Sequence, residues 1–193
     1  MRIIKQLREA TNNLHRAIEK VSMSKSIISC SLSVDDYKKL IQKNYFIHTK
    51  VELAFAEFQK IPSSKQLDYS YHSRLPSLQL DLKTLDLIPP EINADHLMLA
   101  SLENVSGMLG ALYVVEGSSL GNKVIYKHLR KNTFLQEIPE FYFFKNDQIK
   151  SPHSWKNFIE IAEKEITDID SATRAACHLF EFYKKVYEAP LFS

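Results

Sequence analysis

The chain has 193 residues, of which 45% are hydrophobic and 25% are charged, and its formal net charge is +2. This composition is ordinary for a globular protein of one domain, so it excludes a disordered chain and predicts a single domain over residues 1–193. The nearly balanced charge gives no reason to expect nucleic acid as a partner.

The sequence also argues against a membrane partner and against an oxidising compartment. The longest apolar stretch, residues 105–115, is about half of the ~20 residues that a membrane-spanning helix needs. The first residues carry frequent charges and lack the apolar segment of a secretory signal. Cys30 and Cys177 lie far apart without a CxxC motif, so neither a disulfide nor a thiolate zinc site is expected. We therefore predict a cytoplasmic protein.

The first half of the chain is predicted to form three helices. Apolar residues recur every three or four positions over residues 2–21, which indicates an amphipathic helix. A second, longer helix is expected to begin at Ser33 or Asp35 and to end near Phe58. A third is expected to begin near Pro76, because proline is favoured in the first turn of a helix.

The second half is predicted to contain one long bent helix and two more helices. Helical periodicity resumes at Asp95 and continues beyond residue 130, with a bend expected at residues 117–121, where glycines and serines interrupt it. The following aromatic stretch has no clear period and is expected to be a loop or an edge element. Two final helices are predicted over residues 152–167 and 171–188. The predicted architecture is all-α, with six or seven helices around one core.

All the glycines of the chain fall within fifteen residues of the bent helix: Gly107, Gly110, Gly117 and Gly121. A glycine inside a helix costs about 1 kcal/mol relative to alanine, so the pattern suggests a specific gain. At 3.6 residues per turn the four share one face, which leaves the main chain bare. This face fits close packing of another helix or the approach of a flat ligand. The hydroxyls of Ser118 and Ser119, near carbonyls that a bend would free, favour the ligand slightly.

His15 lies beside apolar positions of the first predicted helix. Glu19 follows one turn later and could hold the imidazole as a neutral donor to a metal, and Arg8 lies two turns earlier on the same face. Together they suit a planar metallocycle that carries carboxylates. The alternatives are a histidine at the edge of the core and a solvated helix edge for the two charged residues.

The other chemistry-bearing residues form no recognisable motif. The remaining histidines show no HExxH spacing, which disfavours a zinc hydrolase. No Walker loop, GxSxG or GxGxxG motif is present. A basic edge follows the bend and fits a solvated face better than a docking surface. It consists of Lys123, Lys127, Arg130 and Lys131.

Two segments, LREATNNLH at residues 7–15 and LYVVEGSSLGNKVIYKHL at residues 112–129, together resemble the haem oxygenase family, in particular its short soluble bacterial members. The resemblance implies a single-domain haem oxygenase-like helical fold with a kinked distal helix. Haem would lie between the first helix and the kinked one, with His15 as the iron ligand.

On the distal side, the resemblance assigns Gly117, Ser118 and Gly121 to catalysis. The two glycines would let the main chain lie close over the porphyrin and so also bind the haem. Ser118, which stands where animal members have an aspartate, would act with ordered water in delivering protons. Asn122 departs from the family pattern, because many members have a second consecutive glycine there.

The remaining haem contacts implied by the resemblance involve three residues. Arg8 and Tyr113 match residues that meet a haem propionate, and Glu19 matches an acidic residue that holds the proximal histidine.

The implied reaction is the oxidative cleavage of haem to biliverdin, carbon monoxide and ferrous iron. It requires haem, dioxygen and electrons from a separate reductase, and a monomer would suffice for it. Two other hypotheses are a haem carrier or sensor on the same fold that does not cleave haem, and a helical interaction protein whose glycine face packs another helix.

Overall fold

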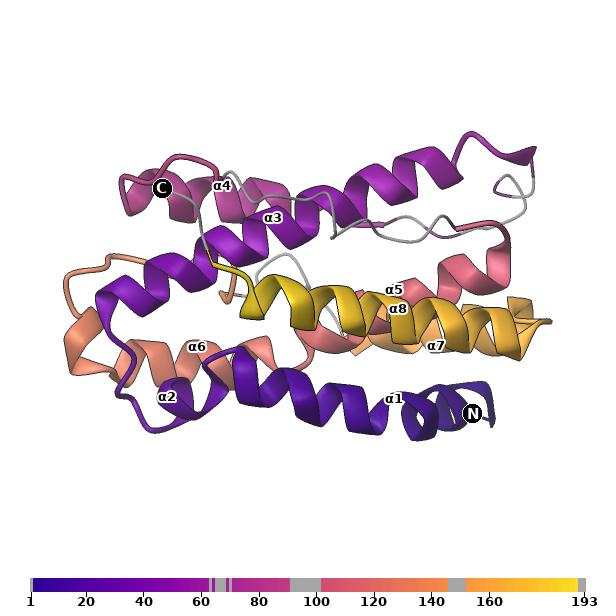
Figure 1. The fold of residues 1–193 in the computed structure, drawn as a ribbon, viewed down its shortest axis with the longest axis horizontal. Helices are drawn as coiled ribbons and strands as arrows, with labels where there is room; N and C mark the ends of the chain where they lie inside the picture. Colours follow the sequence, from indigo (N-terminus) through magenta and orange to yellow (C-terminus); the bar gives the residue numbers. More distant parts are fainter. Residues whose placement is uncertain are drawn as a thin grey trace.

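The computed structural model describes residues 2–62, 64, 69, 71–90, 102–145 and 152–190, without the side chains of 152–154, and its regular secondary structure in these ranges is helical. No strand occurs in these ranges, which confirms the all-α prediction. The elements, shown in Figure 1, are α1 (Arg2–Val21), α2 (Ser24–Ile28), α3 (Val34–Phe58), α4 (Leu75–Thr84), α5 (Val105–Ser119), α6 (Asn122–Lys131), the short 3₁₀ helix η2 (Thr133–Leu135), α7 (Pro152–Glu165) and α8 (Ile169–Glu188).

The bend in the glycine-rich region is confirmed, because α5 ends at Ser119 and α6 begins at Asn122. The serine hydroxyls turn back onto the helix, as expected. Ser118 Oγ donates to the carbonyl of Val115 at 2.8 Å, and Ser119 Oγ donates to that of Glu116 at 2.6 Å. Such hydrogen bonds compete with the main-chain ladder and often bend a helix.

The start of α5 differs from the prediction. Residues 102 and 103 are not helical, and Asn104 caps α5 with its side chain by accepting from the amide of Gly107 at 2.8 Å. The expected helix from Asp95 is therefore wrong over residues 102–104, where an asparagine cap stops it. The rest of that expectation, residues 95–101, lies outside the described residues.

Two smaller differences come from local capping. The five-residue helix α2 was not predicted, since so short a segment has too few turns to show a period. Helix α8 begins at Ile169, two residues before the predicted start, because Asp168 serves as its N-cap and accepts from the amide of Ser171 at 2.9 Å. The predicted cap of α3 is confirmed, as Ser33 Oγ accepts from the amide of Asp36 at 3.1 Å.

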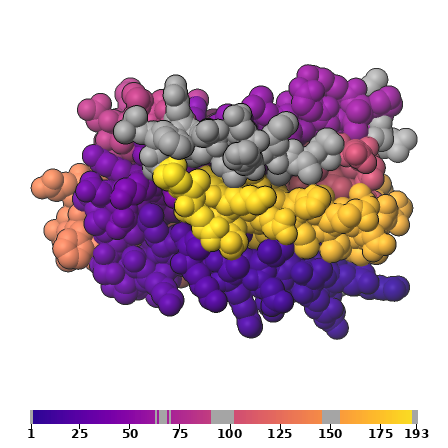
Figure 2. Space-filling model, in the orientation of Figure 1, coloured from indigo at the N-terminus to yellow at the C-terminus, as the bar shows by residue number. Residues whose placement is uncertain are grey.

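The core centres on α8, which packs against α5 on one side and α1 on another. Figure 2 shows α8 in yellow directly beside α1 in indigo on one face of the molecule. A second apolar cluster joins α3 and α4 to residues 135–144. In the part of the chain that is described, no helix is long and apolar enough to cross a membrane.

Candidate functional site

The imidazole of His15 lies on an accessible face of α1. Its side chain is 59% exposed, and its Nδ1 lies 3.3 Å from Oε1 of Glu19. The ring edge faces Phe180 of α8, with ring centroids 6.0 Å apart. Because Glu19 engages Nδ1, Nε2 is the nitrogen left for a ligand. The predicted contact between His15 and Glu19 is therefore present, on a surface that a ligand could cover.

Arg8 and Tyr113 come from different helices, α1 and α5. Burial raises the pKa of the half-buried Tyr113 phenol, while the hydroxyl of Thr11 and the charge of Arg8 oppose that rise. The phenol of Tyr113 is thus within hydrogen-bonding reach of Thr11 and within the electrostatic influence of Arg8. Such a group suits the carboxylate of a ligand, since both Arg and Tyr donate hydrogen bonds to carboxylates.

The glycine face divides into two parts with different surroundings. A Cβ placed on Gly110 would lie 2.0 Å from the main-chain oxygen of Ala172, so α5 and α8 touch there main chain to main chain. A Cβ on Gly117 would meet nothing closer than the Trp155 ring at 3.7 Å, and one on Gly121 would meet only the carbonyl of Ser118, also at 3.7 Å. Helix packing therefore explains Gly110, whereas no main chain of another helix approaches Gly117 or Gly121.

An aromatic group that the sequence did not indicate lies beside Gly117. Trp155 of α7 stacks on Phe158 at 5.4 Å between centroids and lies 6.1 Å from the ring of Tyr113. Its ring faces Gly117 at ordinary van der Waals distance. The main chain of Gly117 is thus covered by a side chain, and that of Gly121 is not.

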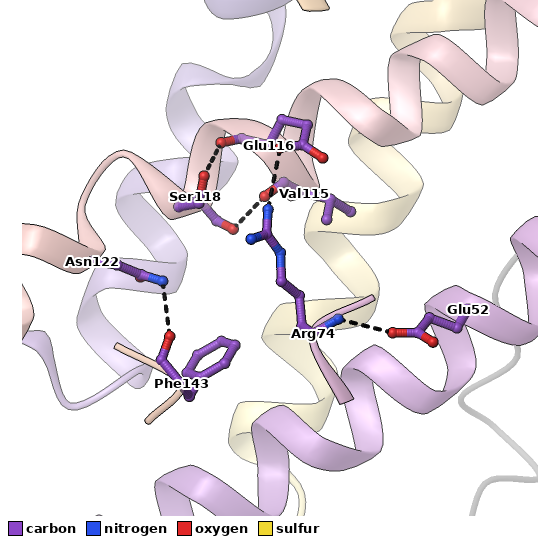
Figure 3. Close-up of polar contacts among 8 residues, drawn as sticks. Glu52, Arg74, Val115, Glu116, Ser118, Asn122 and Phe143 are labelled. Carbon is purple, nitrogen blue, oxygen red and sulfur yellow. Dashed lines mark hydrogen bonds and ion pairs between the residues drawn. The ribbon is translucent and has the colours of Figure 1, made fainter. Parts of the chain in front are cut away.

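Ser118 and Asn122 point in different directions at the kink (Figure 3). Ser118 is exposed, and its hydroxyl is held by the carbonyl of Val115. Asn122 is buried, and its Nδ2 donates a long hydrogen bond of 3.5 Å to the carbonyl of Phe143. The residue that departs from the family pattern therefore ties the kink to the segment after η2.

A buried ion pair lies next to Gly117. Arg74 Nη2 is 3.2 Å from Oε2 of Glu116, and the two side chains are 10% and 5% exposed. Glu52 of α3 accepts from the main-chain amide of Arg74 at 3.1 Å (Figure 3). Helices α3 and α5 are thereby joined through the residue that caps α4.

His48 adds a neutral imidazole to the same buried region. Burial, with a smaller contribution from the charge of Arg74, lowers the pKa of His48 to about 3. Its ring lies 5.4 Å from that of Phe143 and 6.5 Å from that of Tyr183. Four buried polar atoms here have no hydrogen-bond partner among the described residues: His48 Nδ1, Tyr71 Oη, Glu116 Oε1 and Tyr183 Oη. Unpaired polar atoms in one region indicate a place for ordered water.

Sequence reasoning missed this buried group for a physical reason. His48, Arg74 and Glu116 come from three helices, and no spacing rule relates them. The one signal in the sequence was a charged residue, Glu116, within the apolar run that precedes Gly117, because a carboxylate there needs a buried partner.

The described residues fit a planar iron porphyrin that carries carboxylates. His15 offers a nitrogen to a metal, Arg8 and Tyr113 offer donors to carboxylates, and Gly121 offers main chain without a covering side chain. No cluster of three histidine, cysteine or carboxylate residues that could hold a metal ion occurs in the part of the chain described. A single histidine ligand is what a porphyrin requires of the protein on one side of its iron.

Comparison with known proteins agrees with this geometry. The protein-family model described as Heme oxygenase matches residues 1–189. A curated haem oxygenase of Porphyra purpurea is 26% identical over 164 residues, which are 79% of this chain and 69% of that protein. One of Xanthomonas campestris is 29% identical over 103 residues, 51% of this chain and 55% of that protein.

Solved structures share the fold. The structure of haem oxygenase-1 from the cyanobacterium Synechocystis, in complex with haem, superposes with a TM-score of 0.73 at 18% identity, covering 97% of this chain and 91% of that one. The NO- and CO-bound haem oxygenase of Neisseria meningitidis gives a TM-score of 0.69 at 23% identity, covering 96% of this chain and 89% of that one.

Proposed function

This chain belongs to the haem oxygenase family, and from that premise we propose that it oxidatively cleaves haem to biliverdin, carbon monoxide and ferrous iron. Haem is the substrate and supplies the iron at which dioxygen is activated; the protein orients it and controls its surroundings. The observation that carries the proposal is the bare main chain at Gly121, at the end of a helix that is otherwise closely packed.

On the proximal side, His15 would hold the iron through Nε2. Glu19 would accept from Nδ1–H, which fixes the tautomer that leaves Nε2 free for the iron and fixes the orientation of the ring. Phe180 supports the ring edge from α8. The exposure of His15 leaves room for the porphyrin, which would cover it.

Arg8 and Tyr113 orient the substrate. A guanidinium and a phenol held together at one edge of the site would bind a propionate and fix the rotation of the ring about the iron–histidine axis. That rotation decides which meso carbon lies beneath the kink. These two residues therefore bear on the biliverdin isomer formed.

On the distal side, Gly117 and Gly121 let the main chain of the kink approach the porphyrin face. Main chain this close would restrict the space above the porphyrin and so would favour dioxygen directed toward the ring edge. Ser118 contributes an exposed hydroxyl at the kink, which can hold a water molecule and pass a proton through it.

Turnover needs dioxygen and electrons from a separate reductase. The basic edge of α6 is exposed. Both cysteines are free, as a reducing cytoplasm would keep them, and the proposed working form is a monomer.

Incubating the purified protein with haem and ascorbate under air tests the proposal. We expect the Soret band to decay while a biliverdin band rises, with the rate greatly reduced in His15→Ala. A stable Soret band under reducing aerobic conditions would instead show a carrier or sensor. No Soret shift on adding haem would show a helical interaction protein.

A further inference from the structure

We propose that Asp81 is a positioning residue for the distal side of the haem site, acting through the main chain of Tyr142 and Phe143. The proposal rests on the proposed function, because it concerns how that site is shaped. Asp81 lies on α4, on the side of the second apolar cluster, and it does not touch the kink itself.

Asp81 holds two successive amides with its two carboxylate oxygens. Tyr142 donates to Oδ1 at 2.9 Å and Phe143 donates to Oδ2 at 2.7 Å. The side chain is 1% exposed. A carboxylate buried in an apolar cluster is costly unless its oxygens are hydrogen-bonded, so these two bonds fix residues 142 and 143 to α4.

The clamped segment touches the site in two places. The carbonyl of Phe143 accepts from Nδ2 of Asn122, the first residue after the kink. The ring of Phe143 lies 5.4 Å from that of His48. Figure 3 shows Phe143 opposite Asn122 at the kink. A shift of Phe143 would therefore move both the amide of Asn122 and the wall beside the buried imidazole.

The ionisation of Asp81 gives the clamp a pH dependence. Burial raises the pKa of Asp81 to about 7, although the two donated amide N–H groups oppose the rise. The titratable groups that face it are Glu140, from the same segment as Phe143, which raises the pKa further, and Tyr37 of α3. Above about pH 7 the ionised carboxylate accepts both bonds fully, and below that the protonated acid accepts them more weakly.

The test compares wild type with Asp81→Asn, whose amide group accepts one N–H and turns an NH₂ toward the other. Asp168→Asn is the matched control, since it changes a carboxylate that also accepts a main-chain amide, but at the start of α8. The three proteins are labelled with ¹⁵N, and the Tyr142 and Phe143 amide shifts are followed between about pH 5 and pH 9. The same proteins, loaded with ferrous haem and carbon monoxide, are then measured for the C–O stretching frequency.

We expect the wild-type and Asp168→Asn amides to titrate with a midpoint near pH 7 and the C–O frequency to shift with the same midpoint. In Asp81→Asn both signals are displaced and lose this titration. A C–O band that is the same in wild type and Asp81→Asn would overturn the proposal. If Asp81→Asn does not fold, the wild-type protein alone still tests the proposal. A C–O frequency that stays constant while the Tyr142 and Phe143 amides titrate would overturn the proposal equally. Absence of a carbonyl complex in all three proteins would instead refute the proposed function.

Discussion

The two halves of α5 use glycine for opposite purposes. In the first half, residues 105–112, Gly110 brings the main chain of α5 against that of Ala172 in α8. The second half is taken together with the kink that follows α5, as residues 113–121; its Gly117 and Gly121 have no close main-chain neighbour from another helix. The first half is closed by main-chain packing, whereas the main chain of the second is open at Gly121.

The difference shows why a stripe of small residues does not by itself identify a binding face. Both halves read alike in the sequence, because glycine spacing reports only that side chains are missing. How each glycine is covered depends on what the fold places opposite it. The main chain of Ala172 packs on Gly110, and the ring of Trp155 lies over Gly117. The following experiments separate the two roles, beginning with the largest expected effect.

Gly110→Ala should strongly destabilise the fold. The added Cβ would lie 2.0 Å from the oxygen of Ala172, and main chain cannot move aside as a side chain can. We expect a loss of about 3 kcal/mol or more in the free energy of unfolding, measured by urea denaturation. Gly107→Ala is the control, since its Cβ would meet the Ser171 hydroxyl at 3.3 Å and that side chain can rotate. Equal stability of the two variants would show that α5 and α8 do not touch main chain to main chain at Gly110.

His48 should make the stability of the kink half depend on pH. Its folded pKa of about 3 lies below the ordinary value of 6.5, so the unfolded chain binds a proton first as the pH falls. The free energy of unfolding should decrease as the pH is lowered from 6.5 toward 3, by up to about 1.4 kcal/mol per pH unit from this group. His48→Phe removes the titration, so the pH dependence of unfolding in wild type should exceed that in the variant. If the free energy of unfolding depended on pH equally in wild type and His48→Phe, the imidazole of His48 would be accessible to solvent in the folded protein.

Gly117→Ala and Gly121→Ala should affect the bound state more than the fold. Alanine gains up to about 1 kcal/mol in helix propensity, and neither Cβ meets a close contact, so stability should be unchanged or slightly higher. Biliverdin formation should fall by about tenfold or more in Gly121→Ala, because the methyl added there would lie over the porphyrin face, and by less in Gly117→Ala, whose methyl would face Trp155. Normal turnover with normal isomer composition in both variants would show that this main chain does not face the substrate.

Local patterns in the sequence predicted the helices and the kink well. Apolar periodicity located α1 and α3, and the adjacent serines and glycines located the bend, because these signals act within a few residues. The predicted start of α5 was wrong in the described part, because the cap at Asn104 begins the helix there while the apolar pattern keeps its period. Short α2 had no period to detect.

The site was predicted only in part. The structure brings His15 and Glu19 together and places Tyr113 within the electrostatic influence of Arg8, while the roles of all four toward haem stay predictions. Asp81 and the pair of Arg74 with Glu116 were missed. A buried charge is recognised by its partner, and each of these partners lies tens of residues away in the sequence.

The central claim is that haem iron is bound by His15 beneath the open half of the glycine face. The iron–histidine stretching band of the ferrous haem complex tests it most directly, in wild type, His15→Ala and His178→Ala, the last changing an exposed histidine of α8. The band should be present in wild type and His178→Ala, absent in His15→Ala, and restored there by added imidazole. An unchanged band in His15→Ala would contradict the account.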